Sequence, residues 1–124
     1  MITAAEDRAA DHQPKPLADH FDAYGEHLRA LGVTDKHRKE ATRYLTRLAA
    51  DCSFSRLADL TREAFEGWLA RRTANGMSAR LKNAFRENLV AFCNWSVESN
   101  RLSINPFAAV PKANVKADPR RDKC

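Results

Sequence analysis

The chain has 124 residues, which is enough for one domain built around a single hydrophobic core. Hydrophobic residues make up 44% of the chain and charged residues 30%, as in soluble globular domains, and no apolar run is long enough to span a bilayer. Residues 1–17 do not resemble a signal peptide, so we expect a cytoplasmic protein. The three cysteines form no C-x-x-C motif, and we expect free thiols, no metal and no cofactor.

The net charge of +5 is distributed unevenly along the chain. Three short blocks, residues 32–47, 76–86 and 111–124, each carry a net charge of +3, whereas residues 1–31 carry a net charge of −3. Concentrated positive charge favours an anionic partner over a uniformly charged surface.

The N-terminal part of the chain is predicted to consist of a tail and a first helix. Residues 1–15 show no periodicity and are predicted to be a disordered tail. Apolar residues then recur at helical spacing from 16 to 31, with Pro16 as the expected first helical residue and Gly32 as the stop. The predicted stripe consists of Leu17, Phe21, Tyr24, Leu28 and Leu31.

A second helix is predicted over residues 35–50, with Thr34 as its N-cap. Tyr44, Leu45 and Leu48 fall on its apolar side. A basic stripe occupies the opposite side and consists of Lys36, Lys39, Arg43 and Arg47. The separation of the two stripes is typical of an amphipathic surface helix.

Two further helices follow a connector over residues 53–60. The third begins at Thr61, buries Phe65 and Trp68, and ends at the dipeptide Asn75-Gly76. The fourth spans residues 79–99, with Ser78 as its N-cap. Its apolar face consists of Leu81, Phe85, Leu89, Phe92 and Trp95, and its opposite side carries Lys82, Asn83 and Arg86.

Short-range signals also describe the end of the chain. Asn100 is predicted to adopt the left-handed conformation that ends the fourth helix, and Asn105-Pro106 predicts a turn. Phe107 and Val110 are expected to pack back onto the helices. Residues 16–110 therefore form the predicted folded domain, an all-α four-helix bundle, and residues 111–124 read as a basic linker.

An ordered series of short motifs resembles the N-terminal core-binding domain of tyrosine recombinases of the phage-integrase type, and the resemblance covers about residues 16–111. The motifs are Leu57-Ala58-Asp59-Leu60-Thr61, Trp68-Leu69, Gly76-Met77-Ser78, Asn83, Phe92-Cys93-Asn94-Trp95, Leu102-Ser103-Ile104 and Asn105-Pro106. The sequence departs from the family at Leu81, where the pattern usually has threonine.

The resemblance implies an orthogonal bundle of the SAM-like type that forms half of a clamp around duplex DNA. In that family the second and fourth helices face the DNA, and a separate catalytic domain supplies an Arg, a His-x-x-Arg and a nucleophilic Tyr. The basic linker stands where that domain is expected to begin, and Tyr24 and Tyr44 are predicted to be core residues. We therefore expect no enzymatic activity from this chain by itself.

These expectations define a predicted DNA-binding set on the second and fourth helices. It comprises Thr34, Lys36, Lys39, Arg43, Arg47, Ser78, Arg80, Lys82, Asn83 and Arg86. Lysine and arginine suit phosphate or guanine, and Asn83 suits adenine edges. The expected context is the bacterial nucleoid, where the full-length recombinase oligomerises on DNA and this fragment is monomeric. Two alternatives remain, a helical protein-interaction bundle and a small helical DNA-binding regulator.

Overall fold

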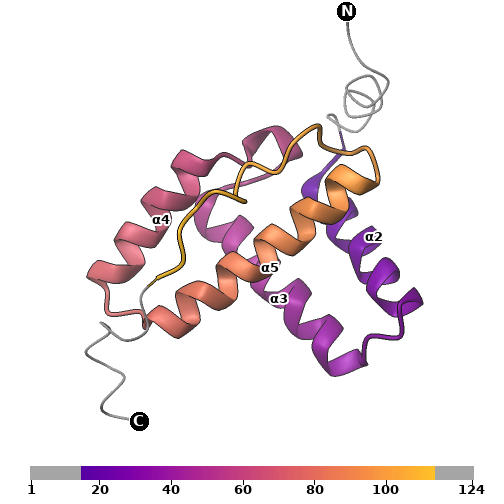
Figure 1. The fold of residues 1–124 in the computed structure, drawn as a ribbon, viewed down its shortest axis with the longest axis horizontal. Coiled ribbons are helices and arrows are strands. Elements are labelled where there is room, and N and C mark those ends of the chain that lie inside the picture. Colours follow the sequence, from indigo (N-terminus) through magenta and orange to yellow (C-terminus); the bar gives the residue numbers. More distant parts are fainter. Residues whose placement is uncertain (1–14, 114–124) are drawn as a thin grey trace, which may run out of the picture.

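The computed structural model describes residues 15–113 and contains four α-helices in that range (Figure 1). They are α2 (Leu17–Ala30), α3 (Asp35–Cys52), α4 (Arg62–Ala74) and α5 (Ala79–Glu98), with a short 3-10 helix over Leu57–Asp59 between α3 and α4. The described residues contain no strand. The prediction of an all-α fold with four helices packed together is confirmed. The predicted tail and most of the predicted linker, including Cys124, lie outside the described residues.

Side-chain hydroxyls cap three of the four helices. Thr34, Thr61 and Ser78 accept hydrogen bonds from the backbone N–H groups of His37, Ala64 and Leu81, at 3.3, 3.3 and 3.2 Å. A helix leaves its first N–H groups without intrahelical partners, so each cap fixes where a helix begins. The predicted caps at Thr34 and Ser78 are confirmed. The sequence predicts that the third helix begins at Thr61, whereas α4 begins one residue later and Thr61 is its N-cap.

The ends of the helices differ slightly from the predicted bounds. Pro16 lies at the N-cap position of α2 and not inside the helix, and α3 continues two residues beyond the predicted end, to Cys52. Gly32 and Asn100 adopt the left-handed conformation, with φ of 82° and 61°. The predicted left-handed conformation of Asn100 is therefore confirmed, and it turns the chain sharply after α5.

The core forms where α3 packs against α2, α4 and α5. Phe21 and Tyr24 of α2 meet Phe92 of α5 edge to face, with ring centroids 5.1 and 5.4 Å apart. Trp68 of α4 meets Phe85 of α5 at 4.9 Å. These aromatic contacts join the helices through the apolar stripes that the sequence predicts.

Leu31 departs from the predicted stripe of the first helix. It lies one residue beyond α2, and 66% of its surface is exposed. Its spacing fits the stripe, but the helix ends before it, so its side chain does not reach the core.

The segment after α5 turns back and runs along α4 and α5 (Figure 1). Phe107 and Val110 are almost completely buried, and the Phe107 ring meets Phe65 of α4 at 5.5 Å. The prediction that both residues pack onto the helices is confirmed. Asn105 fixes the turn before them, since its side chain donates to the Val90 carbonyl and accepts from the Phe107 N–H.

The packed unit continues past Val110 into the range predicted to be linker. The backbone of Ala113 is hydrogen-bonded to Asn83 of α5. None of the helices in the described residues is both long enough and apolar enough to cross a membrane.

Candidate nucleic-acid interface

The outer face of α3 presents a row of cations, Lys36, Lys39 and Arg43, which we call the α3 cationic row. All three side chains are exposed. Within residues 15–113, none of them forms an ion pair with an acidic side chain. The row is therefore exposed positive charge without an ion-pair partner in the described residues, and Asp22 and Glu26 of α2 line a surface hollow with Lys39.

Other cations of the same helix are compensated. Arg38 pairs with Asp35 at 2.6 Å, and only 18% of the Arg38 side chain is exposed. Arg47 continues the row along α3, but it lies 3.9 Å from Asp51 and its guanidinium stands over the Phe85 ring of α5 at 5.5 Å. Arg47 thus joins the row to α5 by packing as well as by charge.

Arg80 lies in the first turn of α5, is exposed, and forms no ion pair within the described range. The first turn of α5 contains no acidic residue. The partial positive charge at a helix N-terminus adds to that of the arginine, so this end of α5 is a favourable place for an anion.

The other predicted residues of α5 have partners inside the molecule. Lys82 donates to the Thr73 hydroxyl at 2.8 Å. Asn83 donates to the Ala113 carbonyl at 3.0 Å and accepts from the Ala113 N–H at 2.7 Å. Arg86 donates through Nε to the Val110 carbonyl at 2.6 Å. All three are only partly exposed.

This arrangement differs from the open polar side that the sequence predicts for the fourth helix. Residues 107–113, which we call the C-terminal segment, cover that side. The irregular backbone of this segment has amide and carbonyl groups that need partners. Asn83 and Arg86 supply those partners. Helical periodicity gives the direction of these side chains but not the segment that returns to meet them.

The hydroxyls of Thr34 and Ser78, also in the predicted set, are used as helix caps. Each accepts an N–H from its own helix, so their role in the structure is to order the N-termini of α3 and α5. The structure thus places Thr34, Lys36, Lys39, Arg43 and Arg47 along α3 and Ser78 and Arg80 at the start of α5, whereas Lys82, Asn83 and Arg86 face α4 and the C-terminal segment.

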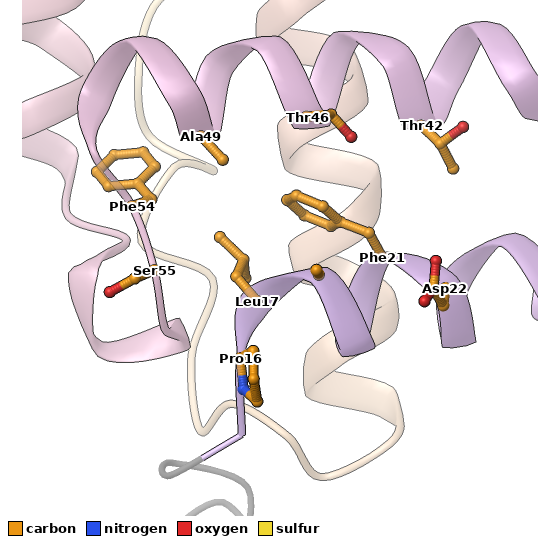
Figure 2. A pocket seen from close by; sticks show the side chains of 10 residues that line it. Pro16, Leu17, Phe21, Asp22, Thr42, Thr46, Ala49, Phe54 and Ser55 are labelled. Carbon is orange, nitrogen blue, oxygen red and sulfur yellow. The ribbon is translucent and has the colours of Figure 1, made fainter.

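An apolar groove lies between α2 and α3, with a volume of about 460 Å³. Figure 2 shows Leu17 and Phe21 pointing from α2 toward Ala49 and Thr46 of α3, with Phe54 at one end. Sequence reasoning does not find this groove, because the short side chains Thr46 and Ala49 leave room only once α2 is packed beside them.

A buried histidine–arginine contact is a second feature that the sequence does not reveal. His20 of α2 is fully buried, and its Nδ1 lies 3.0 Å from the Arg101 guanidinium. The same guanidinium lies 4.8 Å from the Trp95 ring centroid, and burial lowers the pKa of Arg101. The two residues are 81 positions apart, so no local pattern connects them.

The two cysteines of the described residues have raised thiol pKa values. Burial raises the pKa of the Cys93 thiol, and burial also raises the pKa of Cys52 to about 11. Both thiols are free. Because their pKa values are raised, both are protonated at neutral pH. Residues 15–113 contain no cluster of three or more His, Cys, Asp or Glu side chains that could hold a metal ion.

Comparisons with protein-family models, with curated proteins and with solved structures found no match to this chain.

Proposed function

We propose that this chain is a DNA-binding module of the core-binding type that its motifs resemble in tyrosine recombinases. It holds duplex DNA mainly through phosphate contacts, in a SAM-like orthogonal arrangement of its helices. The observation that carries the proposal is the α3 cationic row, three exposed cations with no acidic partner among the described residues. Clustered, uncompensated lysine and arginine on one face are the electrostatic mark of a protein that binds nucleic acid.

The length of the row suits a DNA backbone. Lys36 and Arg43 are seven residues apart on α3, which corresponds to a rise of about 10.5 Å. Three base-pair steps of B-DNA rise by about the same distance. The row can therefore lie along the axis of a duplex over about three base pairs. Arg80 is a further exposed cation, at the start of α5.

Base readout has a smaller part in this proposal. Asn83 is the side chain best suited to an adenine edge, but both ends of its amide are engaged with Ala113. Asn83 and Arg86 are therefore assigned to holding the C-terminal segment. Phosphate contacts position a protein on the duplex without reading its sequence, so this module alone discriminates weakly between DNA sequences.

The proposed module contributes binding and not strand cleavage. Tyr24 is buried against Phe92, and burial raises the pKa of its hydroxyl. Tyr44 packs edge to face on Phe85, with ring centroids 4.8 Å apart. Neither tyrosine is presented as a nucleophile, so the proposal assigns strand exchange to a separate catalytic domain. In a nucleoid setting, the complete recombinase would assemble on DNA while this module remains a monomer in solution.

An NMR titration with a short DNA duplex at low salt tests the proposal. We expect the amide signals of residues 36–47, and that of Arg80, to shift progressively until the site is saturated. A titration that leaves the α3 signals unchanged would remove α3 from the interface and with it the proposed function.

The alternative of a protein-interaction bundle rests on charge complementarity between two faces of the chain. Asp19, Asp22 and Glu26 are exposed on α2, and the α3 cationic row lies on the next helix. The acidic face of one copy could meet the basic face of a second. Light scattering without DNA distinguishes the two functions, since a dimer that dissociates with salt and ignores DNA would favour the alternative.

A further inference from the structure

A second concentration of positive charge lines a hollow between α4, the start of α5 and the C-terminal segment. The hollow has a volume of about 270 Å³. Its lining includes Thr73 of α4, Lys82 and Arg86 of α5, and Lys112 of the returning segment, and no acidic side chain lines it. Three cations from two separate parts of the chain therefore meet in one concave site, away from the α3 cationic row.

Lys82 is held in place and still has protons to donate. Its Nζ donates to the Thr73 hydroxyl, and that hydroxyl itself donates to the Leu69 carbonyl, both at 2.8 Å. A lysine ammonium carries three donors, so two remain. Thr73 thereby fixes the ammonium at the wall of the hollow without neutralising it.

Arg86 is held in a similar way along one edge. Its Nε donates to the Val110 carbonyl at 2.6 Å, and its Nη2 lies 3.5 Å from the Ala108 carbonyl. Its Nη1 forms no hydrogen bond among the described residues. Lys112 is only loosely engaged, since its Nζ lies 3.8 Å from Glu87 and both side chains are well exposed.

We propose that this hollow binds a phosphate group between Lys82, Arg86 and Lys112. A phosphate has several acceptor oxygens, and it matches the spare donors of two ammonium groups and one guanidinium. The volume lies just below the range of sites for drug-sized ligands, which suits one phosphate and its immediate substituent. Occupancy would also tie the segment that contains Lys112 to α4 and α5.

The phosphate could belong to a nucleic-acid backbone or to a free anion, and the α3 cationic row is required for neither. The inference therefore stands apart from the function proposed above. NMR titrations with inorganic phosphate, and separately with a short DNA duplex, distinguish the two sources. Chloride at equal ionic strength serves as the control for general screening.

We expect saturable shifts of the amide signals of Thr73, Lys82 and Lys112 with phosphate, with the duplex or with both. Lys82→Gln and Lys112→Gln should each weaken that binding by about tenfold, which is the loss of one charge-assisted hydrogen bond. Lys36→Gln is the matched control in the titration with inorganic phosphate, because it removes one lysine charge from α3, and it should leave the affinity for inorganic phosphate unchanged.

Shifts with phosphate alone identify a free-anion site, and shifts confined to the duplex identify a contact with the nucleic-acid backbone. The inference is overturned if neither ligand shifts these amides more than chloride does, or if Lys82→Gln titrates like the unaltered protein. In that case the amides of residues 36–47 still report whether DNA binds at α3, so the two proposals can fail separately.

Discussion

The side-chain amide of Asn83 forms two hydrogen bonds with the backbone of Ala113, 30 residues further along the chain. The amide pairs with the backbone as a neighbouring strand would, donating to the carbonyl and accepting from the N–H. Together with the Arg86 contact to Val110, this pair directs the chain along the α4–α5 side as it leaves the bundle. A residue that the sequence presents as a DNA reader is thus an anchor for the C-terminal segment.

Asn83→Ala should therefore loosen the C-terminal segment while leaving the helices intact. Both hydrogen bonds to Ala113 are lost and the partly buried backbone groups lose their partners, so we expect a cost of about 1–3 kcal/mol. Urea unfolding measures the cost, and hydrogen exchange at the Ala113 amide should accelerate far more than exchange at the Leu89 amide. Equal protection of Ala113 in the variant and in the unaltered protein would show that the pair does not hold the segment.

Phe107→Ala should be the most damaging change in the returning segment. The ring is completely buried and packs edge to face on Phe65, so its removal leaves a cavity between the segment and α4. Truncations of this kind cost about 3–5 kcal/mol, and thermal or urea unfolding would measure the loss. Ala108→Gly, at an exposed neighbouring position, is the control and should change stability much less. A small cost for Phe107→Ala would mean that the segment is not part of the core.

Because the Asp59 carboxylate accepts hydrogen bonds in the folded state, we expect the free energy of unfolding to depend slightly on pH. Hydrogen bonds from the Ser55 backbone and hydroxyl and from the Arg56 backbone lower the pKa of its carboxyl. Because the folded pKa lies below the unfolded value, the stabilisation is complete above the unfolded pKa and is lost as the pH falls through the folded pKa. The Asp59 carboxyl is almost fully exposed, so the effect is screened by solvent.

Comparing Asp59→Ala with the unaltered protein at about pH 6 and about pH 2.5 isolates this contribution. The variant should be less stable at the higher pH, and the difference should shrink at the lower pH. A difference that stays constant between the two conditions would mean that the charge of Asp59 is not what orders the turn before α4.

The sequence predicts well those parts of the fold that depend on neighbouring residues. Thr34 and Ser78 cap their helices as expected, and the spacing of Phe85 and Leu89 identifies a buried face. The exposure of the α3 cationic row also follows from helical periodicity, since apolar and basic residues separate cleanly around α3.

Features that depend on distant residues could not be predicted in this way. The contact of His20 with Arg101 exists only because α2 packs beside the end of α5. The pairing of Asn83 with Ala113 exists only because the C-terminal segment folds back. A polar side chain on an outer helix face has the same periodicity whether water or a returning segment covers it. The hollow around Lys82 has the same origin, because its walls come from α4, α5 and that segment.

The affinity for duplex DNA of the double variant Lys36→Glu and Arg43→Glu tests the central claim most directly. The proposal places five cations on phosphates, namely Lys36, Lys39, Arg43, Arg47 and Arg80. The log–log dependence of affinity on salt should then have a slope of about −4.5, and the variant should reduce the slope to about −2.7. The account also predicts a loss of affinity of about tenfold or more at low salt. The matched control, Arg56→Glu with Arg71→Glu, makes the same change in net charge at exposed positions outside α3 that form no ion pair in the described residues, and it should keep the original slope. Equal affinities and slopes for the two double variants would contradict DNA binding through the α3 cationic row.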